Sequence, residues 1–236
     1  VSLLIFNRYE KALIMAFLLL GRFIPLVSIP LMLQKIKTVT SPILFFVGTK
    51  EFNKQAKKRR RENILLNVNL IGEALIGEEE AAERIQSYCD LLGQEDIDYI
   101  SIKISAIYSQ IKPIAFEITV AVLIKKLARI YDELLLIEKE TGKNKFVNLD
   151  MEEYRDLEIT LETFIQTLAL PRFKKLSAGI VLQAYLPDTH KALTKLQNWA
   201  LDRVANGGSA IKVRLVKGAN IEMEKTDDSI EEWTLT

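Results

Sequence analysis

The chain has 236 residues, 49% of them hydrophobic and 27% charged, so it is long enough and apolar enough to bury a core without disulfides. Its single cysteine and single histidine exclude a disulfide scaffold and a Cys/His zinc cluster. The 32 basic and 31 acidic residues leave a net charge of +1, so no overall field attracts nucleic acid, and we expect no nucleic-acid partner for this segment.

Residues 1–62 are predicted to form a helical lead-in segment. The stretch from Lys11 to Leu33 is mostly apolar, but Arg22 and two prolines interrupt it. A membrane-spanning helix needs about 20 predominantly apolar residues, and no small-residue cleavage site of a signal peptide follows. We therefore expect buried helices packed on the following domain. The basic run Lys57–Arg61 is interpreted as a solvated helix face.

Residues 63–236 alternate short apolar segments with long amphipathic ones. The short segments are typical of strands: Leu65–Ile71, Tyr99–Ser105, Phe146–Leu149, Ile180–Ala184 and Ile211–Val216. The long segments carry apolar residues at three-to-four spacing and predict helices: Glu78–Leu92, Ile114–Glu140, Glu152–Leu168 and Thr189–Ala205. Gly142 and the pair Gly207-Gly208 follow two of these helices, where a left-handed glycine often ends a helix.

Each repeat contains one strand and one helix, which predicts a parallel sheet covered by helices. Two closures remain open, a doubly wound sheet and a (β/α)8 barrel. Neither a Gly-x-Gly-x-x-Gly motif nor a Walker A motif follows any predicted strand. That absence favours the barrel. The predicted fold class is thus α/β, a partial (β/α)8 TIM barrel of about five βα units with an N-terminal helical lead-in.

Polar residues stand at the ends of the apolar strands. Lys103, Asp150, Gln183, Arg214 and Lys217 all occupy such places, where burial is costly unless the side chains find partners. A polar layer satisfied by its own neighbours is one interpretation. We favour the interpretation as a functional site, because a cation, a carboxylate, an amide and an Arg/Lys pair converge on one face.

The chemistry open to such a site is limited. No Ser-His-Asp triad can be assembled, because His190 stands just after Asp188, at a surface or capping position. Glycoside hydrolysis would need two carboxylates at strand ends, and Glu73 and Asp150 are the only candidates. Several cations with one acid suit an anionic substrate and an anionic cofactor. The turn Val216–Ala219 offers small residues and a lysine for close approach to that cofactor.

Five blocks of this sequence resemble successive barrel strands of the flavin-dependent proline dehydrogenases, particularly the bacterial form that is often fused to a pyrroline-5-carboxylate dehydrogenase. The blocks are Asn67–Ala74, Ile100–Ser105, Asn148–Glu153, Val181–Tyr185 and Val213–Ala219. Their order and spacing make the resemblance specific, and it extends from about Gly21 to the end of the chain.

The resemblance implies oxidation of L-proline to Δ1-pyrroline-5-carboxylate, with a hydride passing to FAD and electrons leaving to a quinone. Lys103 would pair with the proline carboxylate and Asp150 would organise the substrate pocket. The implied flavin contacts are Gln183, Arg214, Val216, Lys217, Gly218 and Ala219. The implied location is cytoplasmic, with peripheral contact at the inner membrane.

Two departures from the family pattern stand out. Asn220 replaces a tyrosine common after the Lys-Gly-Ala turn, and the sequence stops at Thr236, before the strands that carry the family's carboxylate-binding arginine pair. Residues 63–236 are therefore expected to be a truncated barrel that is inactive alone. Its candidate partners are the missing half of the barrel, which should restore activity, and a pyrroline-5-carboxylate dehydrogenase domain. The alternatives are a non-catalytic remnant or interaction module, and another TIM-barrel enzyme with a phosphorylated substrate.

Overall fold

The computed structural model describes residues 15, 17, 25–40, 49–70, 75–218, 221–222, 225–226 and 229, and the chain divides into two compact units, Val1–Lys57 and Lys58–Thr236. In the first unit, helix α2 (Pro25–Thr40) contains Pro30 and leaves apolar side chains such as Leu26 and Leu31 exposed. Helix α3 (Lys50–Arg61) buries Phe52 and exposes most of its basic residues. None of the described helices is long and apolar enough to cross a membrane.

The second unit is built on a parallel sheet of five strands. They are β1 (Asn67–Asn69), β2 (Tyr99–Lys103), β3 (Phe146–Asp150), β4 (Gly179–Gln183) and β5 (Lys212–Val216). Every neighbouring pair is parallel, and the strands follow one another across the sheet in the order β1-β2-β3-β4-β5. The predicted alternation of strands and helices is confirmed.

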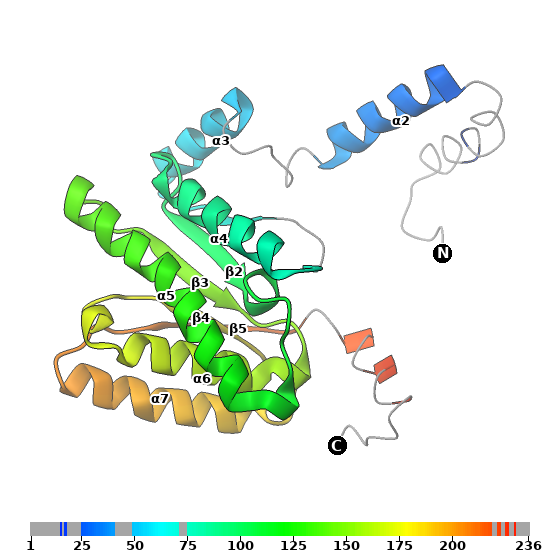
Figure 1. Cartoon of the computed structure of the whole chain (residues 1–236). Coiled ribbons are helices and arrows are strands. Elements are labelled where there is room, and N and C mark those ends of the chain that lie inside the picture. The colour runs from blue at the N-terminus through cyan, green and yellow to red at the C-terminus, as the bar shows by residue number, and fades with distance from the viewer. Residues whose placement is uncertain are drawn as a thin grey trace. The chain divides into compact units, whose positions relative to one another are not determined.

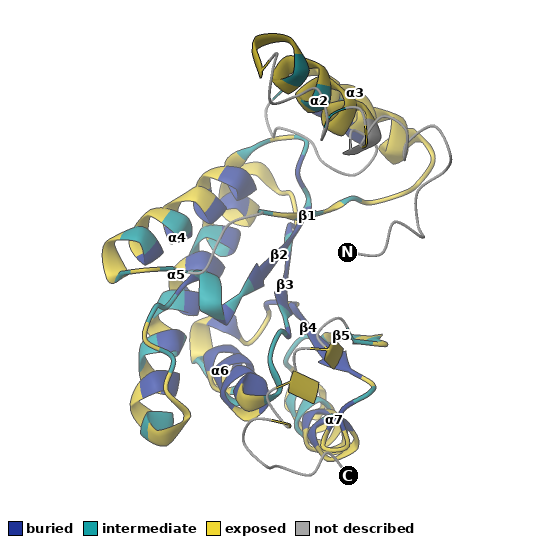
Figure 2. Cartoon of the chain, turned by 90° about the vertical axis from the view of Figure 1, so that its right-hand side faces the viewer, coloured by how far each residue is buried: buried dark blue, intermediate teal, exposed yellow. Residues whose placement is uncertain are grey.

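The strand order decides between the two closures. A doubly wound sheet reverses its order at a switch point, which puts helices on both faces. Here each strand is added on the same side of the last, so right-handed crossovers put every helix on one face. Figures 1 and 2 show helices α4 (Glu78–Gly93), α5 (Phe116–Thr141), α6 (Leu157–Ala169) and α7 (Thr189–Ala205) covering a single face of the sheet. The partial barrel is confirmed.

The two faces of the sheet differ in chemistry because side chains alternate along a strand. The residues facing the helices are apolar, and in the middle strands they are fully buried: Ile100, Ile102, Val147, Leu149, Ile180 and Leu182. The opposite face carries Tyr99, Ser101 and Lys103 from β2 and Asn148 and Asp150 from β3. The core therefore lies between the sheet and its helices, and the polar face is the barrel interior.

Helix α5 shows why the helices pack as they do. Its buried residues Leu123, Leu127, Ile130 and Leu134 recur at three-to-four spacing and form one stripe against the sheet. The helix ends at Gly142, which has a φ of 67° and whose N–H donates to the Glu138 carbonyl at 2.8 Å. A left-handed glycine was expected at this position, and it is found.

Three predicted boundaries were wrong. The helix expected from Glu152 begins at Leu157, after a 3₁₀ turn over Tyr154–Asp156. The reason is tertiary, because the main-chain carbonyls of Met151 and Glu152 accept hydrogen bonds from the Gln183 side chain and stay in a loop. The helix expected from Ile114 begins at Phe116. Strand β1 covers only Asn67–Asn69, while Ile71 lies outside the described residues.

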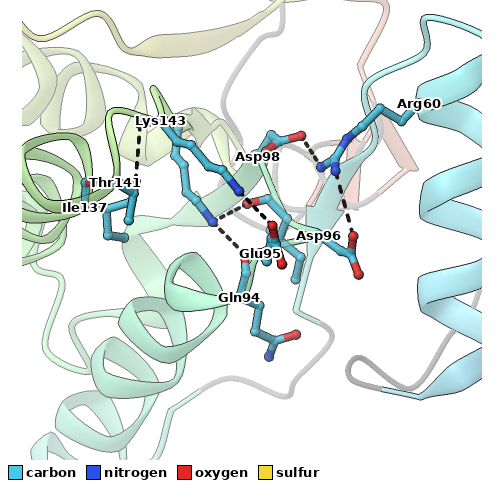
Figure 3. Close-up of polar contacts among 10 residues, drawn as sticks. Arg60, Gln94, Glu95, Asp96, Asp98, Ile137, Thr141 and Lys143 are labelled. Carbon is cyan, nitrogen blue, oxygen red and sulfur yellow. Dashed lines mark hydrogen bonds and ion pairs between the residues drawn. The ribbon is translucent and has the colours of Figure 1, made fainter.

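The amino ends of the strands are held by ionic contacts (Figure 3). Arg60 reaches Asp98 at 2.6 Å and Asp96 at 3.8 Å, and Lys143 pairs with Glu95 at 3.1 Å. The buried Lys145 Nζ donates to the carbonyls of Gln94 and Ile97, at 2.5 and 2.7 Å. Burial lowers the pKa of Lys145 below its ordinary value, although nearby Asp98 opposes the shift.

Candidate active site

The carboxyl ends of β2 to β5 bring most of the predicted site residues to one place. Lys103 is paired in register with Asp150, and Gln183 with Val216. Arg214 lies two positions before Val216 on β5, so its side chain leaves the same face of the sheet. Residues that are separate in the sequence thus share one rim of the barrel interior, which is where reacting groups gather in this architecture.

Asp150 is the centre of a hydrogen-bond network. Its Oδ1 accepts from the Ser101 hydroxyl at 3.1 Å, from Asn148 Nδ2 at 2.8 Å and from Arg214 Nη2 at 3.0 Å. Asn67 Nδ2 extends the network by donating to the Ser101 hydroxyl at 2.8 Å. Three donors on one oxygen hold this carboxylate in a fixed orientation. Asp150 therefore joins strands β1, β2, β3 and β5.

Lys103 is held by a residue that sequence reasoning did not single out. Its Nζ lies 2.6 Å from Glu152 Oε1, and the Ser105 hydroxyl donates to the other carboxylate oxygen. Glu152 comes two residues after the strand-end aspartate, but it was assigned to a helix and not to the rim. Glu152 could have been predicted as a site residue if it had been placed in the β3–α6 loop, since loops after barrel strands carry functional groups.

The Gln183 amide is fixed from one side only. Its Nε2 donates to the carbonyls of Met151 at 3.0 Å and Glu152 at 2.8 Å, so both amide hydrogens are used. Its Oε1 is buried and has no hydrogen-bond partner among the described residues. A buried acceptor without a partner is costly. The amide therefore presents an acceptor that suits the N–H group of a ligand.

The turn after β5 packs closely against the segment that follows β4. The N–H groups of Ala184 and Tyr185 donate to the carbonyls of Val216 and Lys217 at 2.7 and 3.2 Å, which extends the β4–β5 pairing beyond the strands. Gly218 has a φ of 125°, and a Cβ there would lie 1.7 Å from Tyr185 ring carbons. Only glycine is compatible with this position.

Three positions considered from the sequence fall outside the described residues. They are the predicted flavin contact Ala219, the carboxylate Glu73 and the departure from the family pattern at Asn220. Of the other residues, His190 is exposed at the start of α7, as expected for a surface position. Cys89 is buried, in agreement with its interpretation as a small core residue.

Two tyrosines lie close to the charged residues of the site. Burial raises the pKa of Tyr88 to about 12, with Arg84 opposing and the carboxylates of Glu152 and Asp150 adding to the rise. Burial also raises the pKa of Tyr99, against the influence of Arg214. Both phenols therefore stay protonated at neutral pH. They can serve the site as hydrogen-bonding or packing groups, not as bases.

The donor and acceptor set fits a flavin. An isoalloxazine ring alternates hydrogen-bond donors and acceptors along its edge, and it needs the backbone to approach its plane. Gln183 Oε1 is a buried acceptor and Arg214 Nε a buried donor, and neither has a hydrogen-bond partner in the described part of the chain. At Gly218 the Tyr185 ring occupies the place of the missing Cβ, which puts an aromatic ring next to this turn. The remaining cation, Lys103, suits an anionic substrate.

Comparison with known proteins gives a consistent family. A family model described as proline dehydrogenase matches residues 52–236. Proline utilization A (PutA) from Corynebacterium freiburgense is 34% identical with a TM-score of 0.79, over 100% of this chain and 23% of that one. PutA from Bdellovibrio bacteriovorus, inactivated by N-propargylglycine, is 31% identical with a TM-score of 0.68, over 78% of this chain and 21% of that one.

A PutA mutant from Bradyrhizobium japonicum shares the fold at 23% identity and a TM-score of 0.58, over 68% of this chain and 17% of that one. The chain thus spans less than a quarter of the length of the PutA structures that it matches. No curated protein matches the sequence.

Proposed function

Because the chain belongs to the proline dehydrogenase family, we propose that its strand ends form part of an active site that oxidises L-proline to Δ1-pyrroline-5-carboxylate with FAD. The observation that carries the proposal is the gathering of Lys103, Asp150, Gln183 and Arg214 at one rim, with buried Gln183 Oε1 and Arg214 Nε left for a ligand. The reaction class is oxidation of a carbon–nitrogen single bond.

Lys103 is proposed to bind the substrate carboxylate. Its ammonium is part-exposed at the end of β2, at 36% of its side-chain surface, and it already holds a carboxylate, that of Glu152. Asp150 is proposed to organise the substrate pocket without touching the reacting carbon. Its three hydrogen bonds fix Ser101, Asn148 and Arg214 relative to one another. Such fixed polar groups stabilise charge without having to reorganise during the reaction.

Gln183, Arg214 and the turn over Val216–Ala219 are proposed to hold the flavin. When bound, FAD supplies the acceptor for the hydride that leaves L-proline. Gln183 would accept a hydrogen bond from the ring, and Arg214 would place positive charge beside it, where reduction increases the electron density. Lys217, exposed beyond the end of β5, would offer a second positive charge.

The family also suggests the partners of this domain and its cellular location. The matched proteins are named for proline utilization, and this chain covers 23% and 21% of the two at 34% and 31% identity. We therefore propose that the domain works with a pyrroline-5-carboxylate dehydrogenase, which consumes its product, and with a quinone, which reoxidises the flavin. A cytoplasmic location with peripheral contact to the inner membrane follows from a quinone partner.

Flavin binding tests the proposal directly. The chain is titrated with FAD, and binding is followed by quenching of flavin fluorescence. Gly218→Ala is expected to weaken binding by about tenfold or more, because a Cβ there collides with Tyr185 and disfavours the positive φ. Bleaching of the flavin absorbance when L-proline is added to the FAD-loaded chain without oxygen would support the proposed oxidation directly.

Gly207→Ala is the matched control. Gly207 also has a positive φ, 77°, but a Cβ there meets no atom within 4 Å, and the residue follows α7 and not a strand. It should cost some stability and leave FAD affinity unchanged. Failure of the unaltered chain to bind FAD, or equal losses in the two variants, would reject this site.

A further inference from the structure

Two carboxylates, Asp150 and Glu152, hold the two main cations of the site in different ways. The Asp150 side chain is only 14% exposed, and its Oδ1 takes three donors. The Glu152 side chain is 28% exposed and its partner Lys103 is 36% exposed. Part-exposed ion pairs contribute little and are easily exchanged. The two cations are about equally exposed, Lys103 at 36% and Arg214 at 38%, so the difference lies in their carboxylates. An incoming anion displaces the more exposed Glu152 carboxylate more readily than Asp150, which three donors hold in place.

Glu152 has contacts that keep it in place when its carboxylate leaves Lys103. The Ser105 hydroxyl donates to Oε2, the oxygen that does not face Lys103. The main-chain carbonyl accepts from Gln183 Nε2 at 2.8 Å. The backbone of the residue is thus tied to the proposed flavin side of the site, and its side chain to the proposed substrate side.

We propose that Glu152 is a positioning residue: its carboxylate holds the Lys103 ammonium at the rim in the ligand-free protein, and the carboxylate of an amino-acid substrate replaces it there. The identity of that substrate as L-proline rests on the proposed function. Replacement follows from electrostatics, because two carboxylates on one part-exposed ammonium repel each other. The Ser105 hydroxyl then remains as the partner of the displaced side chain.

The exchange has a measurable consequence. Binding of an anionic ligand must break the Lys103–Glu152 pair, so removing the Glu152 charge makes that binding tighter. We expect Glu152→Gln to lower the dissociation constant for L-proline by about two- to fivefold, the range for a part-exposed pair. Pyrrolidine has the same ring and no carboxylate, and it is a cation at neutral pH, so its binding should not become tighter. A merely structural role would affect both ligands alike.

The experiment observes Lys103 itself. Lysine side-chain nitrogens are labelled with ¹⁵N in the full chain, and the Lys103 ammonium signal is assigned by its loss in Lys103→Arg. Glu152→Gln should shift that signal, while the control Glu153→Gln should not. Glu153 is the adjacent carboxylate, and it pairs with Arg155 at 2.6 Å. Calorimetry with L-proline and pyrrolidine then measures affinity in the same proteins.

The glutamine keeps an acceptor oxygen for Ser105, so the variant is expected to fold, and thermal unfolding checks this. Glu152→Ala keeps the main-chain carbonyl that Gln183 uses, and it carries the same expectation if the glutamine variant is unstable. An unshifted Lys103 signal, or unchanged or weaker L-proline binding in a folded variant, overturns the inference.

Failure of the proposed function would give a different experimental result from failure of the exchange. If the unaltered chain does not bind L-proline, the substrate assignment fails, and acetate, the bare carboxylate, replaces L-proline as the probe. Acetate should then move the Lys103 signal at lower concentration in Glu152→Gln than in the unaltered chain. The same concentration dependence in both would overturn the exchange.

Discussion

The two ends of the parallel sheet carry similar numbers of charged groups but use them differently. At the amino ends, Lys145 donates to two main-chain carbonyls and Arg60 lies between two carboxylates. At the carboxyl ends, Gln183 Oε1 and Arg214 Nε are buried with no hydrogen-bond partner among the described residues. The charged groups Lys145 and Arg60 of the amino end are thus paired, whereas two polar side chains of the carboxyl end each keep an unpartnered atom. Buried polar groups are usually hydrogen-bonded, so the two atoms at the carboxyl end call for a partner.

Exposure differs between the ends as well. The side chains of Arg60 and Asp98 are 43% and 28% exposed, and those of Arg214 and Asp150 are 38% and 14% exposed, so the difference lies in the carboxylates. Ion pairs in contact with water contribute little to stability, and breaking a desolvated pair leaves an uncompensated charge. Equivalent charge-removing substitutions at the two ends should therefore have unequal effects.

The largest effect is expected for Asp150→Asn. The change leaves the Arg214 guanidinium without its anion and weakens the bonds from Ser101 and Asn148. We expect the free energy of unfolding to fall by about 2–3 kcal/mol, given that Arg214 is part-exposed, and FAD affinity to fall with it. Urea unfolding and flavin fluorescence measure the two effects.

Asp98→Asn at the other end of the sheet is the matched control. It should lower the free energy of unfolding by less than about 1 kcal/mol and leave FAD affinity unchanged. Equal losses of stability, or a loss of FAD affinity in the control, would contradict the comparison.

A smaller effect is expected for Lys145→Met. The variant removes a buried ammonium and its two hydrogen bonds to the carbonyls of Gln94 and Ile97. Removing the bonds costs more than removing the buried charge gains, so we expect a loss of about 1–2 kcal/mol at neutral pH. FAD affinity should be unchanged, because the residue lies at the opposite end of β3. A change in FAD affinity would show that the two ends are coupled.

The same variant tests the pKa of Lys145. Because burial lowers this pKa from its ordinary value of 10.5, the folded protein releases the proton at a lower pH than the unfolded chain does. The unfolded chain then binds more protons, so this group makes folding more favourable as pH rises from the lowered pKa towards 10.5. Urea unfolding at several alkaline pH values should show a steeper rise, or a shallower fall, in the unaltered chain than in Lys145→Met. Parallel curves would contradict the shift.

The smallest effect is expected for Arg60→Ala. The guanidinium is 43% exposed and pairs with Asp98 at 2.6 Å and Asp96 at 3.8 Å. A pair of this kind contributes about 0.5 kcal/mol, and salt screens it. Unfolding at low and high ionic strength should show the difference from the unaltered chain shrinking as salt is added. A fall in the free energy of unfolding above about 2 kcal/mol would show that the charges at the amino end are desolvated too, and it would contradict the difference between the two ends of the sheet.

Local patterns in the sequence predicted most of the fold. Strands β2 to β5 were located to within two residues at either end, because apolar β-branched runs bounded by polar residues are a local signal. Helices α4 and α7 were predicted with equal accuracy. The start of α6 was wrong because Glu152 and its neighbours have helical propensity, yet their carbonyls bind Gln183, 31 residues away. Propensity carries no information about such a partner.

Local patterns in the sequence were enough to predict the alternation of strands and helices and the family. These depend on periodicity and on the order of short motifs, both local properties. Tertiary packing sets the order of the strands, brings Arg214 to Asp150 across 64 residues, and places Glu152 beside Lys103. A period-two pattern shows that side chains share a face, but the pairing of charges depends on strand register and loop path, which are set by packing of the whole sheet.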